Sequence, residues 1–156
     1  MTHTDHNTWT EHAQGVLKDS GFSRGGARDA VIEYLASQDC AASAQEIHDG
    51  LRNEGRGIGI ASVYRSLEAL QNLQLVQRFD AGHGEGRYEA VAPGGEHHHH
   101  VVCDDCERIL PFEDPALERA IDKLAERVPY AIAGHDVVLH GQCPDCQDAG
   151  RPRRRR

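Results

Sequence analysis

Two pairs of cysteines constrain the fold of this chain more than any other feature of its sequence. Cys103 and Cys106 form one CxxC pair, and Cys143 and Cys146 form a second, with residues 107–142 between them. Each spacing lets two thiolates converge on one ion, and four thiolates complete the tetrahedron that zinc prefers. Because such a closed site leaves no position for water or substrate, we predict one structural Zn²⁺ per subunit.

The cysteine spacing alone would also fit two redox pairs or a set of disulfides. The first residues, MTHTDHNTWTEH, have neither the basic start nor the apolar core of a secretory signal, so we expect a cytoplasmic protein with reduced cysteines. Hydrophobic residues make up 38% of the chain. No apolar run approaches the roughly 20 residues of a transmembrane helix, and we therefore expect a soluble protein without a membrane partner.

A run of four histidines, His97 to His100, stands immediately before the first cysteine pair. A tag remnant or a solvated loop would also explain such a run, but tags stand at chain ends. In an extended segment, His98 and His100 would face one way, and His97 and His99 the other. One strand could therefore serve two metal sites, each completed by ligands from elsewhere in the chain.

The N-terminal half predicts a helix-turn-helix followed by a β-hairpin. Apolar residues at helical spacing from Ala30 to Leu35 predict an amphipathic helix that ends near Ser37. Ser43 and Glu46 then have the spacing of a capping box at the start of another helix. A glycine-bearing turn leads to a further helix, and two β-prone runs around a glycine-rich loop predict a wing. The apolar positions of these two helices are Ile47, Leu51, Val63, Leu67 and Leu70.

The sequence APGG, residues 92–95, interrupts the periodicity, and we place the domain boundary there. The expected fold class is α+β. We predict a winged-helix domain over residues 1–92, a hinge over 93–95, a metal-binding domain over 96–148 and a basic tail over 149–156.

The sequence of the second domain predicts a small α/β module. Strand-prone runs occur at residues 101–102, 109–112 and 137–139, and a helical pattern covers residues 115–128. The inward positions of that helix would be Leu117, Ile121 and Leu124.

The formal net charge is −8, and removing the five arginines of the tail RPRRRR leaves a body of −13. Charge alone therefore argues against a nucleic-acid partner. The tail itself is either a solvated end or an arm that touches phosphates.

Two segments carry a family resemblance. IASVYRSLEAL resembles the recognition helix of ferric uptake regulators, and HHHHVVCDDC resembles their metal-binding signature. The resemblance implies a homodimer in which the 96–148 module is the dimerisation domain. It also implies winged helices that bind a double-stranded, A·T-rich palindromic operator, and a metal-dependent repressor of metal homeostasis genes rather than an enzyme.

The resemblance also implies DNA contacts. Tyr64 would meet a thymine methyl or base edge, Arg65 a phosphate or base, and Lys18 the minor groove. Arg28 and Ser62 complete the predicted contact set. Without the resemblance, a packing role for Tyr64 and a solvated charge at Arg65 would be the expected alternatives.

For metals, the resemblance implies two sites besides the zinc cysteines. One, within the dimerisation module, would use His97, His99, Glu118 and His135. The other, at the hinge, would use His98 and His100 together with Glu89. Because Ala41 occupies the place of a usual histidine ligand, we assign the fourth hinge position to His83, with Asp80 as the next choice.

The sensed metal stays open between Fe²⁺ and Zn²⁺, with Mn²⁺ possible. Gln77, Ala90 and Val91 depart from the zinc-sensing pattern and slightly favour iron, whereas four consecutive histidines are common in zinc sensors. A zinc uptake regulator and a peroxide sensor of the same family are alternatives. Two rivals from other classes are a zinc-dependent hydrolase and a metal-buffering protein with a degenerate winged helix.

Overall fold

The computed structural model describes the chain except for residues 1–5, 24–25, 39, 83, 94–97 and 151–156. The fold is α+β, and it divides into two compact units, residues 1–97 and 98–156, each of which is described by itself. None of the described helices is long and apolar enough to cross a membrane.

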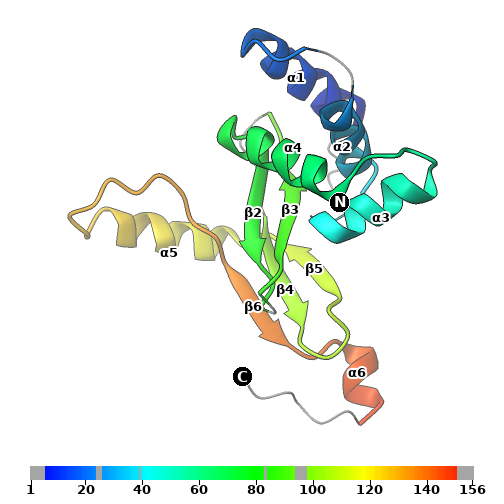
Figure 1. Ribbon diagram of the computed structural model, residues 1–156. Helices are drawn as coiled ribbons and strands as arrows, with labels where there is room; N and C mark the ends of the chain where they lie inside the picture. The colour runs from blue at the N-terminus through cyan, green and yellow to red at the C-terminus, as the bar shows by residue number, and fades with distance from the viewer. Residues whose placement is uncertain (1–5, 24–25, 39, 83, 94–97, 151–156) are drawn as a thin grey trace. The chain divides into compact units, whose positions relative to one another are not determined.

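The N-terminal unit is a winged helix-turn-helix (Figure 1). Helices α2, α3 and α4 pack around one apolar core, and a short three-stranded antiparallel sheet of order β1-β3-β2 follows. Strands β2 and β3 form the predicted hairpin around the glycine-rich loop. The elements are α1 (His6–Asp19), α2 (Ala27–Ala36), β1 (Ala42–Ser43), α3 (Ala44–Asn53), α4 (Ile60–Asn72), β2 (Val76–Asp80) and β3 (Gly86–Ala90).

Helix α1 was not predicted from the sequence. Its inward face is made by Trp9, Ala13 and Leu17, which follow one another at four-residue spacing and are all buried. Val16 packs against the same core. The polar residues between these positions cover the solvent side, so one stripe of apolar side chains is enough to attach this helix to the unit.

The predicted capping box at the start of α3 is confirmed. The Glu46 N–H donates to Ser43 Oγ at 3.1 Å, and the Ser43 N–H donates to Glu46 Oε2 at 2.8 Å. Arg87, on strand β3, donates from Nη1 to the same Glu46 oxygen. Glu46 therefore joins the start of α3 to the wing, a link that sequence reasoning missed.

The pKa of Glu46 reflects this arrangement. Burial alone would raise it, but the hydrogen bonds from the Ser43 N–H and the Arg87 guanidinium outweigh burial, so the pKa lies below its ordinary value. A carboxyl whose pKa is lowered by folding stabilises the folded state above its unfolded pKa, and this stability is lost as the pH falls through the folded pKa.

We expect Arg87→Met to lower the free energy of unfolding at neutral pH by about 1–2 kcal/mol, because Glu46 loses a charged donor but is half exposed and can recruit water. The difference from the unmodified protein should shrink as the pH falls through the folded pKa of Glu46. Urea unfolding at several pH values measures both. Arg56→Met, which breaks the exposed Arg56–Glu33 pair, should lower the free energy of unfolding by less. If Arg87→Met lowers the free energy of unfolding equally at every pH, the role assigned to the Glu46 carboxylate is contradicted.

The C-terminal unit is a three-stranded sheet of order β5-β4-β6 with two helices (Figure 1). Strand β4 pairs antiparallel with β5 and parallel with β6. At the start of α5, Asp114 Oδ1 accepts from the Ala116 and Leu117 N–H groups, and Pro115 occupies the first turn. The elements are β4 (His99–Cys103), β5 (Ile109–Phe112), α5 (Pro115–Ala125), β6 (Val138–Gly141) and α6 (Pro144–Asp148).

The prediction for helix α5 was wrong in two respects. The helix ends at Ala125 rather than Val128, and its apolar stripe is not inward in this chain. Leu117 and Ile121 are only half-buried, and Leu124 is 58% exposed. The reason is architectural, because a single three-stranded sheet offers no second layer to cover this stripe.

Candidate functional site

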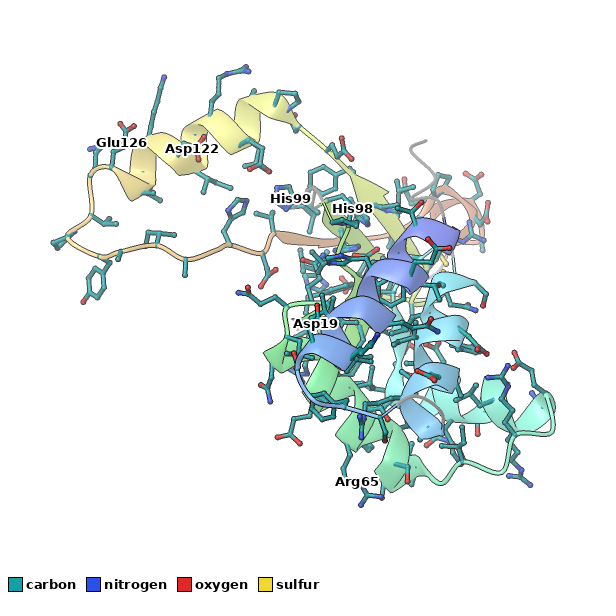
Figure 2. All side chains as sticks on the ribbon, turned by 90° about the horizontal axis from the view of Figure 1, so that it is seen from above. Asp19, Arg65, His98, His99, Asp122 and Glu126 are labelled. Atoms are coloured by element: carbon teal, nitrogen blue, oxygen red, sulfur yellow. The ribbon has the colours of Figure 1, made fainter. Side chains whose placement is uncertain are left out.

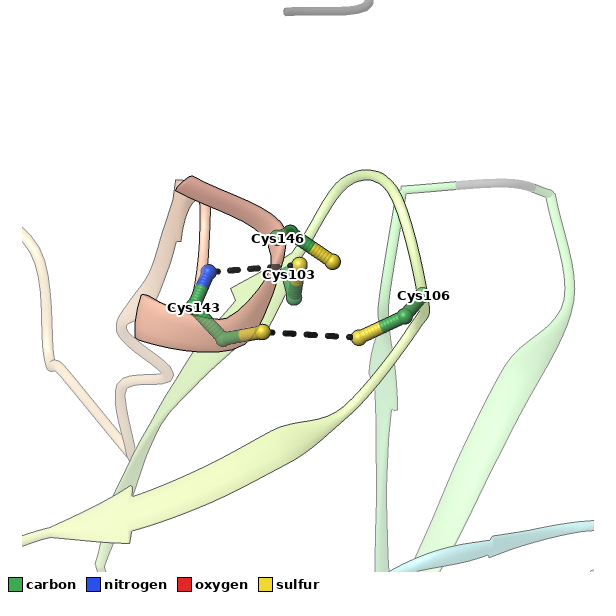
Figure 3. A group of neighbouring side chains, drawn as sticks. All are labelled: Cys103, Cys106, Cys143 and Cys146. Atoms are coloured by element: carbon green, nitrogen blue, oxygen red, sulfur yellow. Dashed lines mark hydrogen bonds between the residues drawn. The ribbon is translucent and has the colours of Figure 1, made fainter. Parts of the chain in front are cut away.

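The four cysteines of the two CxxC pairs converge on one point (Figure 3). Their sulfur atoms all lie within 4.8 Å of one another, and Cys106 Sγ is 3.6 Å from Cys143 Sγ. A zinc ion bound tetrahedrally at about 2.3 Å places its sulfurs about 3.8 Å apart. The cluster therefore fits Zn²⁺, and it ties the turn after β4 to the start of α6.

A backbone hydrogen bond favours the thiolate form of one cysteine in the cluster. The Cys143 N–H donates to Cys103 Sγ at 3.3 Å, and this hydrogen bond lowers the pKa of Cys103 to about 6. Burial and the neighbouring sulfur atoms raise the pKa of Cys146 to about 12. Four thiolates at this spacing repel one another, so a divalent cation is the species that would let all four ionise.

Polar contacts that the sequence did not reveal join the two cysteine turns. Arg108, just after the first pair, forms an ion pair with Asp145 at 2.7 Å. His140 Nδ1 lies 3.1 Å from Asp104 Oδ1, and the Gln142 amide donates to Asp105 at 2.5 Å. These contacts hold the two turns together around the sulfur cluster.

A second cluster, within the same unit, consists of His99, Glu118 and His135. His99 Nε2 lies 2.6 Å from Glu118 Oε1, and His135 Nε2 lies 3.3 Å from Glu118 Oε2. His99 is buried in β4, whereas Glu118 on α5 and His135 before β6 are half-buried. Two imidazoles and a carboxylate within 4.8 Å fit a divalent metal with mixed nitrogen and oxygen ligands. The fourth residue predicted for this site, His97, lies outside the described residues.

The predicted alternation along the histidine run holds where the structure describes it. His98 and His100 lie together, with ring centroids 5.1 Å apart, and His99 turns to the other face, towards Glu118. Of the other residues assigned to the hinge site, Glu89 lies on β3 in the N-terminal unit, where its carboxylate accepts from the Gln77 amide at 3.1 Å. His83 lies outside the described residues, and the hinge site stays a prediction.

Helix α4 presents the central residues of the predicted DNA contact. Tyr64 is 51% exposed, so it is not the core-packing aromatic that the alternative would require. Arg65 is exposed, and Figure 2 shows its side chain pointing outward from the helix. Its Nη2 donates to Ser62 Oγ at 3.0 Å, which holds the guanidinium close to the first turn. This exposure is what the predicted contact with the major groove requires.

The two remaining DNA-contact candidates lie on other helices. Lys18 is exposed in the last turn of α1. Arg28 is in the first turn of α2 and is half-buried, with its guanidinium 4.3 Å above the ring of Phe22. This cation–π contact gives Arg28 a structural role, and its predicted contact with DNA stays a prediction.

Comparisons with known proteins agree with this architecture. Residues 20–140 match the ferric uptake regulator family. The chain is 34% identical over 136 residues to the ferric uptake regulation protein of Neisseria meningitidis, covering 86% of this chain and 93% of that protein.

Two solved structures are similar to this chain in fold and in sequence. The ferric uptake regulator of Vibrio cholerae has a TM-score of 0.72 and 30% identity, covering 83% of this chain and 98% of that one. That of Helicobacter pylori, described as having three functional metal binding sites, has a TM-score of 0.75 and 26% identity, covering 91% and 93%. With a matched family, a winged helix-turn-helix and a four-cysteine cluster, the chain belongs to the ferric uptake regulator family.

Proposed function

We propose that this protein is a homodimeric, metal-dependent transcriptional repressor that binds an A·T-rich palindromic DNA operator and controls metal homeostasis genes. Iron(II) is the favoured regulatory metal, because relatives such as the Neisseria meningitidis protein are named ferric uptake regulation proteins. The structural ion is Zn²⁺ in the cysteine cluster, and the protein acts by binding DNA rather than by catalysing a reaction.

The observation that carries the proposal is the presence of two chemically different metal clusters in one small unit. Four cysteines form a closed sulfur site, which suits a permanent structural ion. His99, Glu118 and His135 form a half-buried nitrogen and oxygen site, which suits a divalent ion that exchanges with the surroundings. A permanent ion stabilises the unit, and an exchangeable ion lets it respond to metal supply.

The chain's own residues supply the coupling in this proposal. Glu118 belongs to α5 and His99 to β4, so metal binding would fix the helix against the sheet. A metal that binds one conformation better than another shifts the population towards it. The hinge residues His98, His100 and Glu89 would pass the response to the winged helix, where α4 presents Tyr64 and Arg65 to DNA.

A homodimer is supported by the exposed apolar surface of the C-terminal unit. Leu110 on β5 and Leu139 on β6 are both in register with Val101 on β4, so the three side chains form a row across one face of the sheet. Leu110 is 62% exposed and Leu139 is 50% exposed. A second copy of the same face would cover this row, as two-fold interfaces do.

The test is a fluorescence titration of labelled A·T-rich promoter DNA with chelator-treated protein that retains its zinc, adding iron(II), manganese(II) or zinc(II) separately without oxygen. We expect one metal to raise the DNA affinity roughly 5- to 150-fold, the usual range of allosteric coupling. His98→Ala with His100→Ala, and separately Glu118→Gln, should reduce this response.

The matched control for this titration is His12→Ala, which removes an exposed histidine of α1 outside the predicted sites. This variant should respond to metal as the unmodified protein does. Equal DNA affinity with and without every metal would disprove the repressor mechanism, and failure to bind any promoter DNA would favour a metal-buffering role.

A further inference from the structure

The arginines of the N-terminal unit differ in whether a carboxylate of the protein forms an ion pair with them. Arg56 pairs with Glu33 at 2.6 Å, and Arg87 pairs with Glu46. Arg78, on strand β2, is exposed and has no ion pair or hydrogen bond from its side chain to any residue that the structure describes. Among the described residues, no carboxylate forms an ion pair with this guanidinium, although the chain has a net charge of −8.

The nearest carboxylate along the same strand does not compensate Arg78. Asp80 points to the same side of the hairpin, two residues further along β2. Its Oδ1 accepts from the Gly82 N–H at 2.6 Å and so shapes the start of the wing loop. The Asp80 carboxylate thus hydrogen-bonds within the loop and forms no ion pair with Arg78 in the described structure, so the guanidinium stays available to an external anion.

The lack of a side chain at Gly86 leaves room for the Arg78 guanidinium. Arg78 is in register with Tyr88, and Asp80 with Gly86, so Gly86 is the diagonal neighbour of Arg78 across the hairpin. A Cβ atom on Gly86 would lie 2.7 Å from Cζ of Arg78. Any side chain at position 86 would therefore displace the guanidinium from the surface of β3.

Arg78 also shares a hollow with the DNA-contact helix. The hollow has a volume of about 400 Å³, and its lining includes Tyr64 of α4, Arg78 of β2, Tyr88 of β3 and Glu85 of the wing loop. The guanidinium and the exposed face of α4 thus border the same space. Among the residues that line the hollow, Arg78 has the positive side chain and Glu85 the negative one, so Arg78 is the lining residue that could bind an anion.

We propose that Arg78 is a further DNA-contact residue, which binds a backbone phosphate beside the groove that α4 enters, and that Gly86 positions its guanidinium. This inference rests on the proposed DNA-binding function. Because the recognition helix occupies the groove, we expect a residue on the strand beside it to meet the sugar-phosphate edge rather than the bases. The planar guanidinium can bind a phosphate through two parallel N–H groups, and the contact carries no base information.

The experiment measures binding of the metal-loaded, full-length protein to promoter DNA and to a scrambled duplex at several salt concentrations. For Arg78→Ala, we expect roughly tenfold weaker binding to both duplexes. The slope of log affinity against log salt should become shallower by about 0.9 for each phosphate that the variant no longer binds. Arg78→Lys should recover the slope, because it keeps the charge.

Gly86→Ala provides a second, independent variant. It leaves the charge in place but moves the guanidinium, so binding should weaken while the thermal unfolding temperature stays unchanged, since only the end of a flexible side chain must shift. Arg56→Ala is the matched control: it removes an arginine that is already paired with Glu33, and it should leave the salt slope unchanged.

The outcomes separate this inference from the proposed function. If the unmodified protein binds no promoter DNA, the proposed function fails, and this inference fails with it. If the unmodified protein binds and Arg78→Ala keeps its affinity and salt slope, only the Arg78 assignment is overturned. Weaker binding of Arg78→Ala to the promoter alone would also overturn it, because that result would indicate a base contact.

Discussion

Replacing Cys103 with serine is expected to remove the zinc and unfold the C-terminal unit while the N-terminal unit stays folded. The apolar residues that the structure shows buried in this unit are Val102 and the cysteines Cys103 and Cys146, too few for an independent core. Structural zinc contributes about 10–16 kcal/mol in small zinc-bound folds. A bound zinc ion would therefore take the place of the core that this unit lacks.

Three measurements check this expectation. After chelator treatment that empties the histidine sites, elemental analysis should show about one zinc per subunit in the unmodified protein and none in Cys103→Ser. Circular dichroism should lose the signal of the C-terminal strands, and hydrogen exchange should still protect α2, α3 and α4. Cys40→Ser is the control, because Cys40 lies outside the sulfur cluster. If the variant lacks zinc and its C-terminal unit still has the same free energy of unfolding as in the unmodified protein, the structural role of the ion is refuted.

The second large effect is expected from Leu110→Glu combined with Leu139→Glu. These two side chains lie on either side of Val101 on one sheet face, and the proposed dimer buries them. Burying an unpaired carboxylate costs several kcal/mol, and the two-fold axis would repeat both charges in the partner. The variant should sediment as a monomer and lose promoter affinity, because a palindromic operator needs two recognition helices at a defined spacing.

Analytical ultracentrifugation at several protein concentrations measures this change, and metal content shows whether the zinc site survives. Ala149→Glu adds a carboxylate at an exposed position after α6 and serves as the charge control. We expect the control to remain dimeric. A double leucine variant that sediments with the mass of the unmodified dimer would place the interface elsewhere.

Features with short-range causes were predictable from the sequence. The capping box at Ser43 and Glu46 depends on two side chains within one helical turn, and it formed as predicted. The hairpin followed from two β-prone runs around a glycine-rich loop, which adopts positive φ at Gly82 and Gly84. Each CxxC pair is also a short-range feature that delivers two thiolates to one ion, and the need of zinc for four ligands predicted that the two pairs converge.

Two errors show where periodicity alone misleads. Helix α1 escaped prediction because its buried stripe, Trp9, Ala13 and Leu17, is a single row among polar residues, and its attachment depends on a core formed by distant helices. Helix α5 has an apolar stripe that predicted burial, yet Leu124 is exposed. Amphipathicity shows which side of a helix avoids water, but not what covers that side.

The sequence by itself determined the zinc cysteines, the histidine run and the winged helix-turn-helix, because these depend on local spacing and on backbone preferences. Apart from the cysteines, only the tertiary structure decided which distant side chains meet. Residue spacing could not bring Glu118 and His135 to His99, and these two were expected only through the family resemblance. The Glu46–Arg87 link and the placement of Arg78 against Gly86 were found only in the structure. Such contacts depend on strand register and on how helices pack against the sheet, which the whole folded chain sets.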